Sequence, residues 1–120
     1  MSFFEKLDEL LSALEIPCYE GQPDFGEEPE PEAFISYNVY DYPALSGCGK
    51  ELVTCYNVTV NIYTSGENRA VIADNIAHAL WNLAEPEGFV RRGGSCGYTD
   101  DYPDHYHRII EMICNYNNNE

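Results

Sequence analysis

Three side chains near the carboxyl end are of the types that bind zinc. Cys96, His105 and His107 offer one sulfur and two ring nitrogens, and zinc takes three or four such ligands in a tetrahedron. Residues two apart on a strand point to the same face, so both histidines could reach one ion. This spacing matches no zinc motif, so we expect a polar strand start with two exposed histidines and no metal site. A fourth ligand would have to be Asp100, Asp101 or Asp104.

A cysteine–histidine pair is the other arrangement that could do chemistry, for instance Cys96 or Cys114 with a histidine. Activation of the thiol needs positive neighbours that lower its pKa, whereas the surrounding residues are acidic. The Gly93–Gly97 segment is rich in glycine, but it lacks the lysine and the following helix of a phosphate-binding loop. We therefore predict no catalytic residues and no cofactor, and we expect that the protein is not an enzyme.

The charge balance of the 120-residue chain is strongly acidic. Six Lys and Arg stand against 21 Asp and Glu, which gives a formal net charge of −15 at pH 7. Sequence-specific nucleic-acid binding and attachment to anionic membranes need the opposite balance, so both are disfavoured. No apolar run reaches the roughly 20 residues of a membrane span, and no secretory signal is visible, which favours a cytoplasm. The five cysteines contain no CxxC pair and are expected to be free, mostly buried thiols.

The first predicted helix covers residues 2–15. Ser2 and Glu5 have the spacing of a capping box, and Pro17 ends the pattern. The apolar residues recur at helical spacing, which predicts one buried stripe. These residues are Phe4, Leu7, Leu11 and Leu14.

The second predicted helix covers residues 67–84 and ends before Pro86. A second possible capping box runs from Thr64 to Glu67. Trp81 is expected at the edge of the core and His78 on the surface. The expected buried stripe, with alanines as small fillers, is Ile72, Ile76, Leu80 and Leu83.

Four segments with β-rich composition or period-two alternation predict strands. They are residues 33–41, 52–63, 88–92 and 105–116. Segments 42–50 and 93–104 are interpreted as a hairpin connection and a turn-rich loop. Segment 20–32 carries three prolines and six acidic residues and predicts a solvated acidic loop, and 117–120 is a polar tail.

These elements predict a single α+β domain over residues 1–120 with the order α-β-β-α-β-β. The expected architecture is a mainly antiparallel four-stranded sheet with two helices packed on one face. The second face is expected to be polar, because Asn57, Thr59 and Asn61 alternate with apolar residues on the clearest strand.

The order of short sequence cues along the chain resembles one known family. The cues are Ile16–Gly21 after the first helix, Phe34–Tyr37, Tyr56–Thr64, Gly88–Phe89 and Tyr106–Glu111. This order, over nearly the whole chain, resembles the tail-completion proteins of long-tailed bacteriophages and prophages. These proteins are also called tail-terminator or tail-to-head joining proteins.

The resemblance implies a structural subunit that forms a ring, typically a hexamer, and has no catalytic residues. Such a ring caps the head-proximal end of the tail tube, stops its polymerisation and joins the tail to the head. The implied partners are further copies of the chain, the tail-tube protein and head-completion proteins. The implied location is the host cytoplasm during assembly and then the virion.

A closed ring needs a contact between two different surfaces of the subunit. We expect it to involve the segments Tyr42–Lys50 and Tyr98–Asp104, because both present tyrosine in loops. The acidic surface would suit a channel wall that does not hold DNA. The candidate contact residues are Tyr42, Leu45, Tyr98 and Tyr102.

Two other hypotheses fit the sequence. The chain could be an acidic inhibitor or immunity-type protein that blocks a basic partner such as a nuclease, since complementary charge speeds association. It could also be a small metal-binding domain that uses Cys96, His105 and His107.

Overall fold

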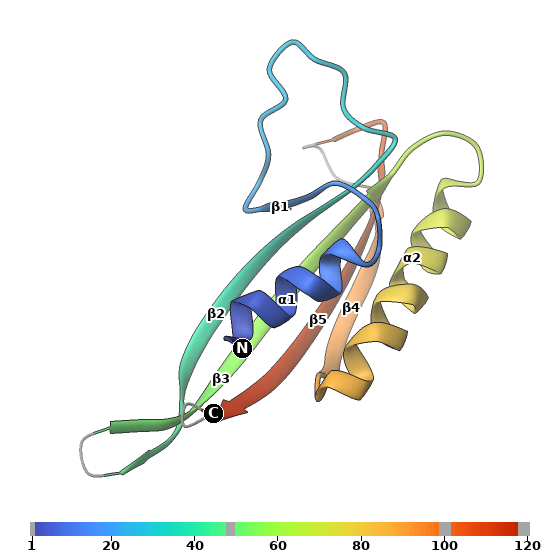
Figure 1. The fold of residues 1–120 in the computed structure, drawn as a ribbon. Helices are drawn as coiled ribbons and strands as arrows, with labels where there is room; N and C mark the ends of the chain where they lie inside the picture. Colours follow the sequence, from blue (N-terminus) through green and yellow to red (C-terminus); the bar gives the residue numbers. More distant parts are fainter. Residues whose placement is uncertain (1, 48–49, 99–101, 118–120) are drawn as a thin grey trace.

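The computed structural model describes residues 2–47, 50–98 and 102–117, and it shows an α+β fold with two helices on one face of a sheet (Figure 1). The sheet has five strands, not the four expected from the sequence. In chain order the elements are α1 (Phe3–Ser12), β1 (Cys18–Glu20), β2 (Ala33–Gly47), β3 (Lys50–Thr64), α2 (Arg69–Ala84), the short 3-10 helix η1 (Glu85–Glu87), β4 (Val90–Tyr98) and β5 (Tyr106–Asn117).

The strands lie in the order β1-β2-β3-β5-β4. β1 pairs parallel to β2, and all other neighbours pair antiparallel, so the sheet is mixed. The sequence interpretation missed β1 because this strand has only three residues and no room for an alternating pattern. Its backbone pairing with residues 35–37 of β2 is what defines it.

The first predicted helix is confirmed, but it begins one residue later and ends three residues earlier than the predicted 2–15. The Ser2 hydroxyl accepts from the Glu5 N–H, and the Glu5 carboxylate accepts from the Ser2 N–H, which completes the capping box. Phe3, Leu7, Leu10 and Leu11 are buried. Phe4, which the predicted stripe contained, is 52% exposed, because the buried face is rotated by one residue toward Phe3.

The predicted capping box of the second helix was wrong. Thr64 is the last residue of β3, and its hydroxyl donates to the Arg69 carbonyl at 2.6 Å. α2 begins at Arg69 after Asn68, which has a left-handed backbone conformation (φ 49°) and makes no side-chain cap. The chain therefore turns from sheet to helix through backbone geometry at Asn68.

The buried stripe of α2 also differs from the prediction. The residues that face the sheet are Ala73, Ala77, Leu80 and Ala84. Small side chains let the helix backbone approach the sheet closely. Ile72 and Leu83 are 41% and 38% exposed, and Ile76 is half-buried. His78 is exposed and Trp81 packs at the edge of the core, as expected.

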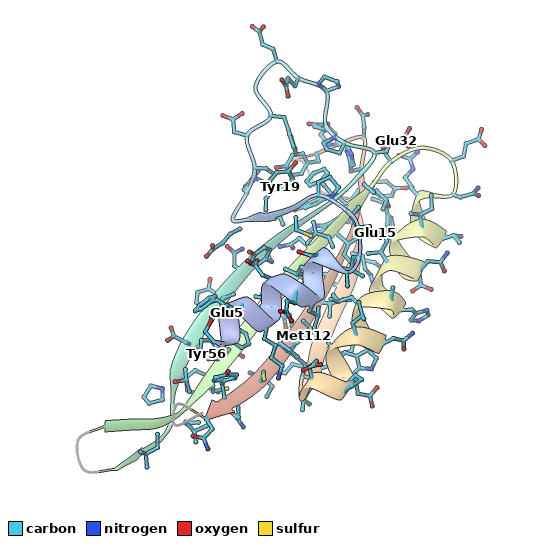
Figure 2. All side chains as sticks on the ribbon, viewed as in Figure 1. Glu5, Glu15, Tyr19, Glu32, Tyr56 and Met112 are labelled. Atoms are coloured by element: carbon cyan, nitrogen blue, oxygen red, sulfur yellow. The ribbon has the colours of Figure 1, made fainter. Side chains whose placement is uncertain are left out.

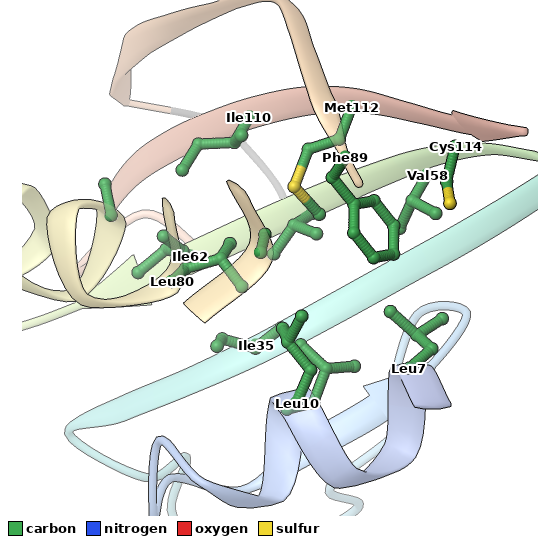
Figure 3. Close-up of a cluster of buried hydrophobic side chains, with 14 of the residues drawn as sticks. Leu7, Leu10, Ile35, Val58, Ile62, Leu80, Phe89, Ile110, Met112 and Cys114 are labelled. Atoms are coloured by element: carbon green, nitrogen blue, oxygen red, sulfur yellow. The ribbon is translucent and has the colours of Figure 1, made fainter. Parts of the chain in front are cut away.

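The main core lies between the two helices and the sheet (Figure 3). Leu7 and Leu10 of α1 and Leu80 of α2 point toward the middle strands, where Val58 and Ile110 are buried. The ring of Phe3 stacks on Tyr56 of β3 at 3.8 Å between ring centroids. Each fully buried large side chain contributes roughly 1.5–3 kcal/mol by leaving water. We call this covered face of the sheet the helix side.

Most of the predicted connection 42–50 is strand. β2 continues to Gly47, and its pairing with β3 shifts register at Pro43/Leu45 and Leu45/Ser46. Proline is tolerated here because this part of β2 has a neighbouring strand, β3, on one side only. The result is a long hairpin that extends beyond the rest of the sheet (Figure 1).

The first half of the predicted loop 93–104, up to Tyr98, is also strand. β4 pairs with β5 through the glycine-rich segment up to Tyr98, with a register shift between Arg91 and Gly93. A Cβ at Gly94 would collide with the Ile109 carbonyl oxygen of β5. Glycine there permits the close approach of the two strands, which is the opposite of its usual meaning as a strand breaker.

A second, aromatic core covers one end of the other face of the sheet. Phe34, Tyr63 and Tyr102 are buried there, with Tyr19 and Phe25 packed against them. The Phe34 ring stacks on Tyr63 at 4.8 Å and meets Phe25 edge-on at 5.2 Å. The acidic loop is therefore packed on the sheet through Phe25, which the sequence interpretation as a solvated loop did not anticipate.

Candidate functional site

The structure separates the three residues of the hypothetical zinc set. Neighbouring residues of a strand point to opposite faces, so Cys96 lies on the helix side and His107, which is level with Gly97, on the other. The expectation of two exposed histidines was wrong, because His105 is 3% exposed and His107 is half-buried. Among residues 2–47, 50–98 and 102–117, no three His, Cys, Asp or Glu side chains are placed to hold a metal ion. Asp100 and Asp101 lie outside that part of the chain.

Both histidines have structural partners. His107 Nε2 lies 2.8 Å from Asn61 Oδ1, and its ring stacks on Tyr63. His105 Nε2 donates to the Pro31 carbonyl at 2.9 Å, because a carbonyl oxygen only accepts. His105 Nδ1 faces the Glu30 carboxylate, with 3.8 Å between Nδ1 and Oε2. His105 therefore holds the end of the acidic loop on the sheet.

Two of the described thiols are held in their protonated form. Burial, and after it the charge of Asp8, raises the pKa of Cys18 to about 11. Burial also raises the pKa of Cys114, which was one candidate for a cysteine–histidine pair. Cys55 and Cys114 are buried, Cys18 is half-buried and Cys96 is exposed. Cys48 lies outside the described residues.

We predict that Cys96 reacts with maleimide much faster than Cys18 at pH 8. A thiol with a pKa of about 11 is thiolate in roughly one molecule per thousand at that pH, and only the thiolate attacks. Labelling of Cys18 should rise about tenfold per pH unit up to about pH 11. Peptide mapping by mass spectrometry in a Cys48→Ser background measures both rates, and Cys96→Ser should remove the fast phase. Equal rates at pH 8 would contradict the raised pKa.

We call the part of the second sheet face that the aromatic core does not cover the open face. Strand pairing arranges its side chains in rows across β2, β3, β5 and β4. The row next to the aromatic core is Ser36, Asn61, Ile109 and Ser95, and the next is Asn38, Thr59, Glu111 and Gly93. The row farther on is Tyr40, Asn57, Ile113 and Val90, followed by Tyr42, Cys55 and Asn115.

Charged side chains are almost missing from the open face. In the four rows, the charged residues are Glu111 and, at the register shift of β4, Arg92, whose Nη1 lies 3.4 Å from Asn57 Oδ1. Tyr40 and Val90 are 69% and 59% exposed. A shallow hollow of about 490 Å³ lies here, lined in part by Tyr40, Asn57, Arg92 and Glu111. Charge depletion with exposed tyrosine is the composition of an interface core.

The acidic residues are placed elsewhere. Most of those in the described part of the chain lie on α1, on the acidic loop, on and around α2 and in η1, while Glu20 is on β1 and Asp41 on β2 (Figure 2). Glu5 and Glu15 lie at the two ends of the first helical segment, and Glu32 lies where the acidic loop enters β2. Within the described residues, most of the acidic side chains thus lie on the helix side and at one end of the sheet.

Both edges of the sheet have backbone that no other described strand pairs with. β4 is an edge over its full length, and β2 is an edge from Asn38 onward, because β1 pairs only with residues 35–37. Free strand edges are ready templates for pairing with another chain. The open face and the two edges together form the candidate interaction site.

The four predicted contact residues lie in different surroundings. Tyr42 is 49% exposed on the open face, and Tyr98 is 66% exposed at the end of β4, beneath the Arg69 guanidinium at 5.7 Å. The expected exposure of Tyr102 was wrong. Its ring is 5% exposed in the aromatic core, where its hydroxyl donates to the Pro23 carbonyl at 3.0 Å. The side chain of Leu45 lies outside the described side chains, and its backbone pairs with Val53.

The sequence interpretation missed Tyr40, Ile113 and Val90 on the open face and the two arginines on the β4 edge. The alternation of 36–42 with asparagine, tyrosine and serine could have identified the β2 part of this face. Val90 and the two arginines lie in the predicted strand 88–92, but this segment was too short to show which face each residue occupies, and the glycines that follow hid the rest of β4.

No family model and no curated protein matches this chain. Within the described residues, neither helix combines the length and the apolar character that crossing a membrane requires.

Proposed function

We propose that this protein is a ring-forming subunit of phage or prophage tail completion, which ends the tail tube and joins the tail to the head. The observation that carries the proposal is a nearly uncharged open face, in a chain of net charge −15, bounded by two free strand edges. A nearly uncharged surface in so acidic a chain is suited to contact another molecule or to line the channel of a ring. Two free edges on opposite sides of one sheet allow head-to-tail contacts that close into a ring.

The placement of the acids refines the proposed role of the charge. If the open face lines the ring, DNA would pass a wall of tyrosine, asparagine and threonine, which offers phosphates no cluster of cations. The acidic loops would gather at one mouth of the ring, because each is held at the same end of its sheet. Proposed partners are the tail-tube protein and head-completion proteins, with the virion as the final location.

We predict that the purified protein forms hexameric particles of ring size, alone or when tail-tube protein is added. Size-exclusion chromatography with light scattering measures the mass, and negative-stain microscopy shows whether the particles are rings. A protein that stays monomeric and never binds tube ends would contradict the proposal. As a control, tube protein from an unrelated phage should not be capped.

The ordered acidic loop favours one second candidate, an inhibitor of a basic protein such as a nuclease. The loop is fixed by Tyr102 and His105, so its carboxylates are presented without the full cost of ordering a flexible segment. Tight binding of a basic protein by a monomer, with loss of binding after charge removal from the loop, would favour this candidate over the ring.

A further inference from the structure

The two free edges of the sheet carry opposite charge. The β4 edge contains Arg91 and Arg92, both exposed, and no acidic residue. The edge made by β1 and β2 contains Glu20 and Asp41, both exposed, and no basic residue. In the described part of the chain, neither arginine forms an ion pair. Arg92 donates to Asn57 Oδ1, and the exposed Arg91 guanidinium is available to a partner.

The direction of the strands suits pairing between copies. β2 is antiparallel to β3, β3 to β5 and β5 to β4, so β4 runs opposite to β2 and to β1. Rotation about an axis along the strands does not reverse them. A neighbouring copy in a ring would therefore bring its β1–β2 edge antiparallel to β4, which is the more stable pairing.

The strand pairing within one copy shows which residues of different strands lie at the same position along the strand direction. Arg91 is opposite Met112, Met112 opposite Val58 and Val58 opposite Val39, so Arg91 is level with Val39 and on the helix side. Gly94 is level with Tyr37 by the same route through Ile110.

The edge that receives β4 has a step at the level of Arg91. β1 ends at Glu20, opposite Tyr37. From Asn38 onward β2 itself forms the edge of the sheet, so the edge is set back there by one strand spacing, about 4.8 Å, which we call the recess. Along β2, Glu20 is level with Tyr37, two residues before Val39, and Asp41 lies two residues after Val39. Both acidic residues are on the helix side. Glu20 and Asp41 therefore place two acidic residues beside this recess.

We propose that copies of this chain join head to tail through the β4 edge of one copy and the β1–β2 edge of the next, with Arg91 lying between Glu20 and Asp41 of the next copy. Gly93 and Gly94 have no side chains, so β1 of the next copy can approach the β4 edge closely at this position. The recess below β1 leaves room for the long arginine side chain. This inference rests on the proposed ring and adds the surfaces and the charges that hold it together.

A charge swap tests the contact with two complementary variants. The first carries Arg91→Glu, and the second carries Glu20→Arg with Asp41→Arg. Each alone places like charges at every contact, and self-association should weaken about tenfold or more. An equal mixture restores opposite charges at every contact and should form alternating rings of wild-type size. A control variant with Asp74→Arg and Glu85→Arg, both exposed and outside the two edge strands, should assemble like the wild type.

Light scattering gives the masses, and circular dichroism confirms that each variant is folded. If the wild type forms rings but the mixture of variants does not, the edge contact is overturned and the proposed function stands. If the mixture is restored but all assemblies are open filaments, the edge contact stands and the ring is overturned. A wild type that is monomeric, alone and with tail-tube protein, together with a monomeric mixture, overturns both.

Discussion

Replacement of Phe34 by alanine should lower the free energy of unfolding by about 3–5 kcal/mol and release the acidic loop from the sheet. The Phe34 side chain is fully buried, and its ring is the centre of the aromatic core. It contacts Phe25 of the loop at 5.2 Å, Tyr63 of β3 at 4.8 Å and Tyr102 at 5.1 Å, all between ring centroids. Its removal leaves a cavity under the only aromatic side chain that the loop contributes.

Two measurements separate the local from the global effect of Phe34→Ala. Denaturant unfolding gives the loss in free energy, and cleavage by a glutamate-specific protease within residues 27–32 reports release of the loop. Phe4→Ala is the matched control, because Phe4 is 52% exposed, and it should cost about 1 kcal/mol or less. Equal losses for the two variants, or a loop that stays resistant to protease, would show that Phe34 does not hold the loop.

The second large effect is expected at Leu80 of α2. Leu80 is fully buried between alanines that bring the helix close to the sheet, so the surroundings cannot easily collapse into the space it leaves. Leu80→Ala should therefore cost about 2–5 kcal/mol. Leu83→Ala, three residues farther along the same helix, should cost about 1 kcal/mol or less, because Leu83 is 38% exposed.

Thermal and denaturant unfolding of the two leucine variants decide between the observed helix face and the stripe that the sequence suggests. Both substitutions keep a good helix former, so differences in helix propensity cancel. If Leu83→Ala were as costly as Leu80→Ala, α2 would have to be rotated so that the larger side chains face the sheet. Far-UV circular dichroism of each variant before unfolding checks that the helix is retained.

The sequence was sufficient to predict elements in which pattern and burial agree. The capping box and leucines of α1 and the alternation over Tyr56 to Ile62 of β3 gave the right element types and the right covered face. In α2 the pattern was misleading, because apolar residues cover more than one side of the helix and the alanines, not the isoleucines, face the sheet.

The remaining elements depend on contacts between distant segments. β1 exists through pairing with β2, and the glycines of β4 are set by the closeness of Ile109. Tyr102 is buried because a loop some 80 residues earlier in the chain offers the Pro23 carbonyl and the Phe25 ring. The candidate site follows from strand order, which no local pattern encodes, so Arg91 and Val90 could not have been identified beforehand.

The free edge of β2 also makes this protein vulnerable to aggregation. Residues 34–40 (FISYNVY) form an uncharged, β-prone segment of the kind that stacks into fibrils when two of its copies meet. In the folded chain β1 covers residues 35–37, while Asp41 and Pro43 stand directly after the segment and act as gatekeepers. Conditions that detach β1 would leave Asp41 and Pro43 as the residues of β2 that oppose stacking into fibrils. Protein that aggregates during storage should therefore do so first as fibrils that start from this strand.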